Sequence, residues 1–220
     1  YPYWWVTSPR PHFHAPALPA TVDVAIVGSD YTGLFPALVV ACACRPTLVL
    51  DAQDAGWGCS SRNGGQISTS IKPGYDELSR RHGSEAAFAI LKEGQNALAW
   101  IGDFIGSESM DCAFKVTGRF HAAHTPRHFE ELAASTENQP KGLEVPVHVV
   151  PRAEQHRELG TDYYHGGVVY EAHASLDPGR YHQALLERVL QAGGQVIPDC
   201  AVTGIEKHGT GFRVATRSGE

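Results

Sequence analysis

The sequence lacks the features that mark several common classes of protein. No apolar stretch reaches the roughly 20 residues that a membrane-spanning helix needs, and no basic-then-apolar signal peptide opens the chain. The net charge of −6 is mildly acidic, which argues against a nucleic-acid-binding surface, because such a surface needs a clustered basic face. We therefore expect a cytoplasmic protein with no nucleic-acid partner and no membrane span.

Paired cysteines are also missing. The five cysteines follow neither the spacing of a zinc site nor that of a secreted disulfide framework, so we expect free thiols. Twelve histidines include the pairs His12/His14 and His121/His124, but no carboxylate or cysteine pattern completes a ligand set. The sequence therefore predicts no metal site and places these histidines at the surface.

The composition is that of a globular protein. Of 220 residues, 42% are hydrophobic and 19% charged, which is enough for a real core in one large or two small domains. The chain begins at Tyr1 without methionine and stops at Glu220 inside a strand-like stretch, so we expect a fragment. Residues 1–20 are rich in proline and aromatic residues, which indicates an extended arm that covers apolar surface or docks a partner.

A strand–helix–strand unit follows the arm. "TVDVAIVG" (21–28) is β-branched and ends in glycine, "SDYTGLFPALVVACAC" (29–44) has helical apolar spacing, and "PTLVLD" (46–51) is a second apolar strand. A unit of about 30 residues in this order is typical of a parallel crossover. The fold class is therefore predicted to be α/β with a parallel sheet.

The rest of the chain alternates helices and short strands. We predict helices over 85–105 and 126–139, and another over 177–194 with Asp177 as its cap. "AFKVTGRFHAAH" (113–124) predicts a hairpin. Further strands are predicted by four short apolar segments, 145–150, 195–199, 201–209 and 211–220.

The first glycine cluster points to a cofactor. Gly28 and Gly33 bracket a turn between a strand and a helix, and in the dinucleotide fold such glycines permit a tight turn and close packing of helix on strand. Asp51 ends the second strand, 23 residues after Gly28, where an acid binds ribose hydroxyls. The order of strand, turn, helix, strand and acid predicts a dinucleotide site at Gly28, Gly33 and Asp51.

Asp30 stands where this pattern has its middle glycine. A carboxylate about 5 Å from a diphosphate costs about 3 kcal/mol per pair of unit charges at an effective dielectric of about 20. Free amides at the helix N-terminus still favour an anion, and Asp30 can instead turn away to cap the helix. Pro36 lies beyond the first turn of the same helix, and we expect a kink there.

Three segments together carry a resemblance: "VDVAIVGSDYTGL", "LVLDAQDAGWGCSSRNGGQ" and "LDPGRYHQALLERVLQAGGQVIPDCAVTGIEK". With them the chain resembles the amino-terminal half of FAD-dependent oxidoreductases of the D-amino-acid oxidase/glycine oxidase superfamily, in particular members similar to gamma-glutamylputrescine oxidase. The resemblance runs from about Tyr3 to Glu220. It implies a Rossmann-like FAD-binding core with part of an α+β substrate domain, and FAD as the cofactor.

The resemblance also implies roles for individual residues. Gly28 and Gly33, with Asp30 between them, form the pyrophosphate turn, and Asp51 is the ribose acid. A loop that runs past the pyrophosphate toward the flavin consists of Ser61, Arg62, Asn63, Gly64, Gly65 and Gln66. Glycines allow close approach of backbone to the cofactor, and Arg62 can neutralise negative charge by a forked contact. Val202 is a further candidate, through its backbone at the adenine end, although it equally suits a core position.

The implied organisation is discontinuous. FAD-binding segments are expected at 21–110 and 167–220, and a partial substrate domain at 111–166. No motif in this half assigns a catalytic side chain.

The implied activity is oxidation of a C–N bond in a small amine or amino acid, with hydride passing to the flavin. We expect the isolated chain not to be active alone and to need a carboxy-terminal half or a completing chain. The alternative is a non-catalytic scaffold or assembly subunit that has lost FAD binding through Asp30.

Overall fold

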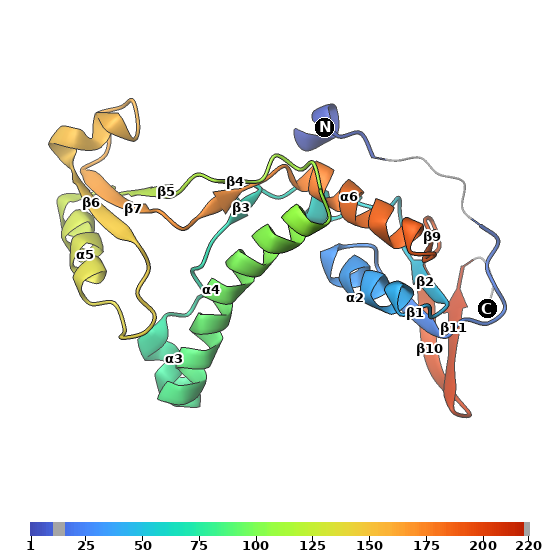
Figure 1. The fold of residues 1–220 in the computed structure, drawn as a ribbon. Coiled ribbons are helices and arrows are strands. Elements are labelled where there is room, and N and C mark those ends of the chain that lie inside the picture. The colour runs from blue at the N-terminus through green and yellow to red at the C-terminus, as the bar shows by residue number, and fades with distance from the viewer. Residues whose placement is uncertain (11–15, 218–220) are drawn as a thin grey trace. The chain divides into compact units, whose positions relative to one another are not determined.

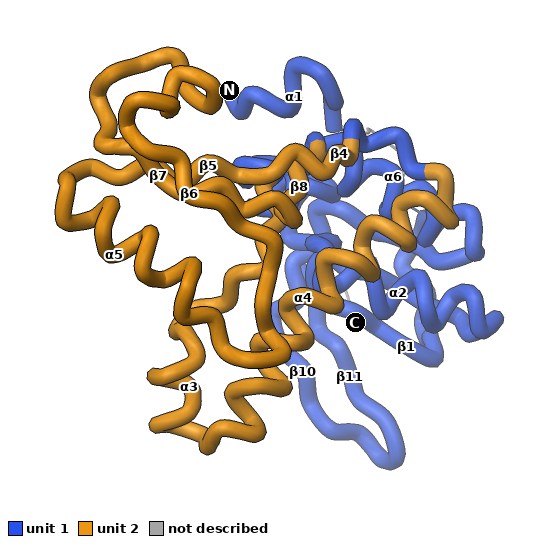
Figure 2. Tube along the Cα trace, turned by 60° about the vertical axis from the view of Figure 1, so that its left-hand side comes forward, with its two compact units in different colours: residues 1–65, 110–113, 177–220 blue, residues 66–109, 114–176 orange. Residues whose placement is uncertain are grey.

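The computed structural model describes residues 1–10 and 16–217, and the chain forms two units. Unit 1 contains residues 1–65, 110–113 and those from 177 onward, and unit 2 contains residues 66–109 and 114–176 (Figure 2). The predictions for 11–15, within the arm, and for 218–220, at the end of the last strand, lie outside the described residues.

A parallel sheet of three strands forms the centre of unit 1 (Figure 1). Its strand order is β1 (Val24–Val27), β2 (Thr47–Leu50) and β9 (Gln195–Ile197), and both pairs are parallel. β2 is buried along its whole length, because it lies between the two other strands. The predicted parallel crossover is confirmed.

Two helices pack together in this unit: α2 (Tyr31–Cys42) and α6 (Pro178–Gln191). α2 continues through Pro36, which is exposed. α6 begins as predicted, because the Asp177 side chain accepts from the backbone N–H groups of Gly179 and Arg180 and Pro178 occupies the first turn. The antiparallel strands β10 (Val202–His208) and β11 (Gly211–Thr216) form a hairpin, as the chain order of the two predicted strands allows.

α2 ends without the glycine that usually closes such a helix. Cys44 takes the left-handed conformation there, with φ +57°, and its N–H donates to Ala41 O at 2.8 Å. Arg45 N–H donates to Val40 O at 3.3 Å. A non-glycine residue therefore occupies a backbone region that favours glycine.

Unit 2 contains two antiparallel sheets of three strands each. One has the order β3 (Gln66–Ile67), β8 (Ala174–Ser175) and β4 (Lys115–Val116). The other has the order β5 (Arg119–Ala122), β7 (Gly166–Tyr170) and β6 (Val147–Pro151). The predicted helix over 126–139 is present as α5 (Pro126–Glu137), capped by Thr125, and contacts β6 and β7.

The remaining helices of unit 2 are α3 (Tyr75–His82), α4 (Ser84–Ser107) and the short 3₁₀ helix η2 (Arg152–Arg157). α4 confirms the helix predicted over 85–105, and it packs against α3. Neither α3 nor β7 was predicted from the sequence.

Two predictions about local structure are wrong. Residues 113–124 do not form a hairpin, because β4 pairs with β8 and β5 pairs with β7, more than 40 residues further along the chain. The arm is not extended throughout, since Trp4–Thr7 form the single-turn helix α1.

The unit boundaries differ from the expected domain boundaries. Residues 66–109 and 167–176, expected in the FAD-binding segments, belong to unit 2. The physical reason is pairing: β3 joins β8 in one sheet, and α4 packs on α3. The assignment of cofactor and substrate binding to particular segments stays a prediction.

Candidate functional site

The glycine turn after β1 fits its surroundings closely. Gly28 has φ +96°, and its N–H donates to Leu50 O at 2.8 Å, which ties the turn to β2. A Cβ added at Gly33 would lie 2.0 Å from Gly28 O, far inside contact distance. Both positions therefore require glycine in the folded protein itself.

Asp30 caps α2. Its carboxylate Oδ1 accepts from Gly33 N at 2.8 Å, and the residue is exposed. In the described part of the chain, the backbone N–H groups of Asp30 and Thr32 have no acceptor. The start of α2 thus offers two free amides to an anion, with one carboxylate beside them.

Asp51 is bonded to the glycine turn. Its Oδ2 accepts from Ser29 N at 2.8 Å and from Ser29 Oγ at 2.5 Å, while its Oδ1 accepts from Gln53 N at 3.0 Å. A carboxylate offers about four acceptor positions, so at least one remains for a ligand hydroxyl. Ser29 is buried and Asp51 is partly exposed, so the acid faces outward from a fixed position.

The second glycine-rich segment, residues 56–65, is called the 56–65 loop below and includes the 3₁₀ helix η1 (Cys59–Ser61). The Tyr31 N–H at the start of α2 donates to Ser60 Oγ at 3.2 Å. This bond holds the 56–65 loop at the same end of the sheet as the glycine turn. Asn63 fixes the loop internally, since its Nδ2 donates to Cys59 O and Ser60 O and its Oδ1 accepts from Gly65 N.

Two glycines of this loop have no neighbours. A Cβ added at Gly58 or Gly64 would meet no atom within 4 Å, and both residues are exposed. The folded chain therefore does not itself explain these glycines. At Gly58 and Gly64 the backbone has no side chain to keep a ligand away, and the same end of the sheet carries free amides and the outward-facing Asp51. This arrangement suits the close approach of a flat cofactor.

Arg62 does not lie free at the loop surface. Its guanidinium lies 5.7 Å from the Trp5 ring centroid and 5.4 Å from that of Trp57, and its Nε donates to Gly58 O at 3.2 Å. A forked contact of Arg62 with a phosphate stays a prediction.

The two remaining predicted residues lie in different settings. Gln66 opens β3 in unit 2 and pairs with Ser175, so it is grouped apart from the other loop residues. Val202 opens β10, where it pairs with Thr216 and packs against the buried cluster Leu48, Leu50, Ile197 and Cys200. Its side chain has the core role that the sequence left open.

The prediction that the histidines lie at the surface is wrong for His182, which the sequence analysis did not identify as part of the site. It is 2% exposed, and its Nε2 lies 2.6 Å from Ser29 O, so Nε2 carries the proton and donates. Burial lowers the pKa of His182, against a smaller opposite effect of the bond to Ser29 and of Asp51 and Asp30. The available signal was a polar residue on the apolar stripe of a predicted helix, beside Tyr181, Leu185, Leu186 and Val189.

The side chains of Tyr31 and Tyr181 pack against each other beside the glycine turn. Their ring centroids lie 5.1 Å apart, and Tyr31 Oη donates to Pro178 O at 3.0 Å. Burial raises the pKa of Tyr181 to about 12 and that of Tyr31 further, so both phenols stay protonated at neutral pH. At neutral pH they are therefore uncharged groups that pack beside the turn.

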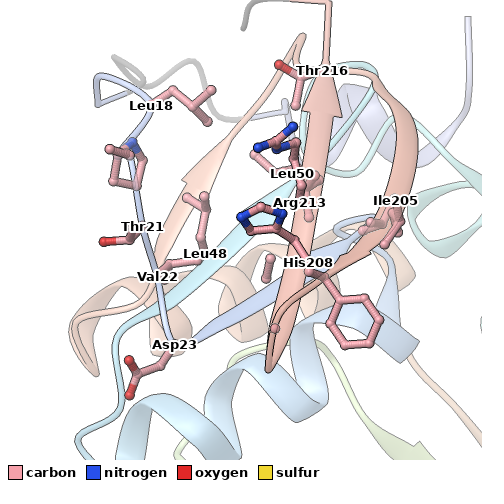
Figure 3. A pocket seen from close by; sticks show the side chains of 17 residues that line it. Leu18, Thr21, Val22, Asp23, Leu48, Leu50, Ile205, His208, Arg213 and Thr216 are labelled. Carbon is pink, nitrogen blue, oxygen red and sulfur yellow. The ribbon is translucent and has the colours of Figure 1, made fainter. Parts of the chain in front are cut away.

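A cavity of about 770 Å³ in unit 1 lies apart from these residues. It is lined by residues 18–23 and by residues of β1, β2 and the β10–β11 hairpin (Figure 3). No predicted cofactor residue lines it. Within residues 1–10 and 16–217, no group of three or more His, Cys, Asp or Glu side chains could hold a metal ion. In the same residues, no helix has both the length and the hydropathy of a membrane-spanning segment.

Comparison with known proteins decides the family. The model of the family described as "DAO: FAD dependent oxidoreductase" matches residues 23–220. The chain belongs to this family. The predicted cofactor, FAD, and the predicted Rossmann-like α/β fold are both confirmed.

Curated relatives match along the chain but are longer. "Probable oxidoreductase OrdL" of Rhizobium meliloti (strain 1021) is 28% identical, and the match covers 100% of this chain and 51% of the relative. The gamma-glutamylputrescine oxidoreductase of Escherichia coli (strain K12) is 29% identical, with 91% and 46% covered. The chain thus spans about half the length of these relatives.

Solved structures show the same fold. Glycine oxidase from Geobacillus kaustophilus has a TM-score of 0.76 at 17% identity, covering 90% of this chain and 52% of that one. The L-alpha-glycerophosphate oxidase of Mycoplasma pneumoniae, with FAD bound, has a TM-score of 0.72 at 17% identity, covering 90% and 50%.

Proposed function

We propose that this chain supplies the dinucleotide-binding part of an FAD-dependent oxidase or dehydrogenase that acts on a C–N bond of a small amine or amino acid. The observation that carries the proposal is the meeting of three elements at one end of the parallel sheet: the Gly28–Gly33 turn, Asp51 and the 56–65 loop. Ser29 joins the turn to the acid, and Tyr31 joins it to the loop. Membership in the family supports the cofactor.

The residues present suit the parts of FAD. The free N–H groups of Asp30 and Thr32 would hold the diphosphate, since helix N-termini favour anions. The remaining acceptor position of Asp51 would take a ribose hydroxyl. Gly64, with open space where a Cβ would stand, would let backbone approach the cofactor. When bound, the flavin would accept hydride from the carbon next to the substrate nitrogen.

The substrate class is supported less directly. Two of the similar proteins are a gamma-glutamylputrescine oxidoreductase and a glycine oxidase, and each is named after an amine or amino-acid substrate. A carboxy-terminal part comparable to the uncovered half of the relatives would complete the active site. The partial substrate domain is assigned to 111–166, most of which lies in unit 2.

Asp30 provides the sharpest test, because its charge and its capping bond can be separated. Asp30→Asn keeps a side-chain oxygen for Gly33 N–H but removes the charge, and asparagine caps helices as well as aspartate does. We expect FAD to bind the purified full-length protein and to bind Asp30→Asn at least about tenfold more tightly, as removal of a nearby like charge predicts.

The measurement is a titration of FAD followed by flavin fluorescence, with Asp30→Ala as the control. That variant removes both charge and cap and is expected to lose about 1 kcal/mol of stability, which Asp30→Asn keeps. Equal affinity in wild type and Asp30→Asn would place the diphosphate elsewhere. A wild type that binds no FAD, together with an Asp30→Asn that does, would favour the alternative of a scaffold that lost the cofactor through this residue.

A further inference from the structure

The amino-terminal arm is bonded to the 56–65 loop through a buried indole. Trp5 is 5% exposed, and its Nε1 donates to Ser61 Oγ at 2.8 Å. Ser61 Oγ in turn donates to Gly56 O at 2.5 Å. A buried indole N–H needs an acceptor, and here the acceptor is a predicted cofactor-loop residue rather than a residue of the sheet.

A second bond joins the same two segments. Trp4 Nε1 donates to Asn63 O at 2.8 Å, and Asn63 is the residue whose side chain fixes the loop from Cys59 to Gly65. Trp4 and Trp5 are neighbours in α1, so one helical turn holds two points of the loop at a fixed spacing.

Cationic side chains surround the indoles. Trp5 and Trp57 lie 5.5 Å apart, and the Arg10 guanidinium lies 4.2 Å from the Trp5 centroid and 4.9 Å from that of Trp57. Arg10 also pairs with Asp54, just before the loop, and Arg62 from the loop lies over the same two rings. Arginine on the face of tryptophan is attractive, so these contacts add to the hydrogen bonds between arm and loop.

We propose that α1 holds the 56–65 loop in the conformation that binds FAD, with Trp5 as a positioning residue that acts through Ser61. The proposal rests on the proposed function of the loop. A segment with four glycines has many alternative conformations, and ordering it at the moment of binding would weaken affinity. The bonds from Trp4 and Trp5 order it beforehand, so FAD affinity should depend on residues that need not touch the cofactor.

The test compares Trp5 with a tryptophan outside the loop. Trp5→Phe keeps an aromatic ring but removes the bond to Ser61, whereas Trp100→Phe is the control, because it makes the same change in α4, where the ring stacks on Phe104. We expect Trp5→Phe to weaken FAD binding about tenfold, as loss of one buried hydrogen bond predicts, and Trp100→Phe to leave it unchanged. At saturating FAD, the visible absorption of the bound flavin should change in Trp5→Phe and not in the control.

A double-mutant cycle separates positioning from general stability. In a Ser61→Ala background the bond is already absent, so Trp5→Phe should weaken FAD binding less than about twofold. Equal effects in the two backgrounds, or an unchanged affinity of Trp5→Phe in a wild type that binds FAD, would overturn the positioning role alone. A wild type that binds no FAD would overturn the proposed function and this role together. If Trp5→Phe does not fold, Trp4→Phe takes its place in the titration, and an unchanged affinity overturns the proposal.

Discussion

The turn at Gly28–Gly33 and the 56–65 loop both place glycines at short spacing, but the surroundings of those glycines differ. In the turn, Gly28 needs φ +96° and Gly33 lies against Gly28 O, so the fold alone demands glycine. In the loop, Gly58 and Gly64 touch nothing where a Cβ would stand. A glycine that the folded chain does not explain is a candidate for direct contact with a ligand. At the turn, by contrast, the features that point to a ligand are the free amides of Asp30 and Thr32 and the carboxylate of Asp51, which the two glycines hold in place.

Of the substitutions considered, Gly33→Ala should change the free energy of unfolding most. Gly33→Ala would place a Cβ 2.0 Å from a backbone oxygen that cannot swing aside, so α2 and β1 would have to separate. We expect the free energy of unfolding to fall by more than about 3 kcal/mol, measured by urea denaturation. A stability close to wild type would mean that the helix and strand do not pack this closely.

A substitution at Gly64 should affect FAD binding and leave stability unchanged, whereas the substitution at Gly33 affects stability. Gly64→Ala has room in the folded protein, so its unfolding free energy should change by less than about 0.5 kcal/mol. FAD affinity should fall about tenfold if the backbone approaches the cofactor there, since an added methyl group would hold it away. The same titration on Gly106→Ala, an exposed glycine of α4 that also meets nothing, should leave the affinity unchanged.

His182 touches both segments, because its ring reaches Ser29 O in the turn and lies 2.8 Å from the Cβ position of Gly56 in the loop. Its pKa is lowered by burial, so below pH 6.5 the unfolded chain binds a proton that the folded protein does not. This residue's contribution to stability is therefore fully present above pH 6.5 and declines as the pH falls toward the lowered pKa. The slope is at most about 1.4 kcal/mol per pH unit.

The check is the unfolding free energy of wild type and His182→Gln between pH 7.5 and pH 5. Glutamine can still donate to Ser29 O but does not titrate, so the variant should show a flatter dependence on pH. Parallel curves for the two proteins would assign the pH dependence to other groups.

The smallest expected effect on stability is at Cys44, where the backbone takes a conformation that favours glycine. Cys44 has φ +57° at the end of α2. Cys44→Gly should stabilise the protein by about 1 kcal/mol, because it removes the crowding of a left-handed side chain. The thermal midpoint measures this, and Cys42→Gly, inside the helix, should instead lower it.

Several elements could be predicted because their signals are local. The first crossover follows from a β-branched run, a glycine turn and a second apolar run, and α6 follows from Asp177 and Pro178 at its start. The candidate cofactor residues Gly28, Gly33 and Asp51 were found in the same way, because the spacing of a turn and a strand end is fixed by the chain itself. The burial of His182 was not predicted, because its partner Ser29 is 153 residues away.

The sequence by itself determined the parallel crossover, the start of α6 at Asp177 and the glycine turn after β1. Each of these depends on backbone geometry and hydrogen bonds within a few residues. Only the tertiary structure decided that β4 and β5 pair with β8 and β7 rather than with each other, and that Arg62 lies over two tryptophans. Strand partners and side-chain stacking are chosen by burial among segments far apart in the chain, and no local pattern records that choice.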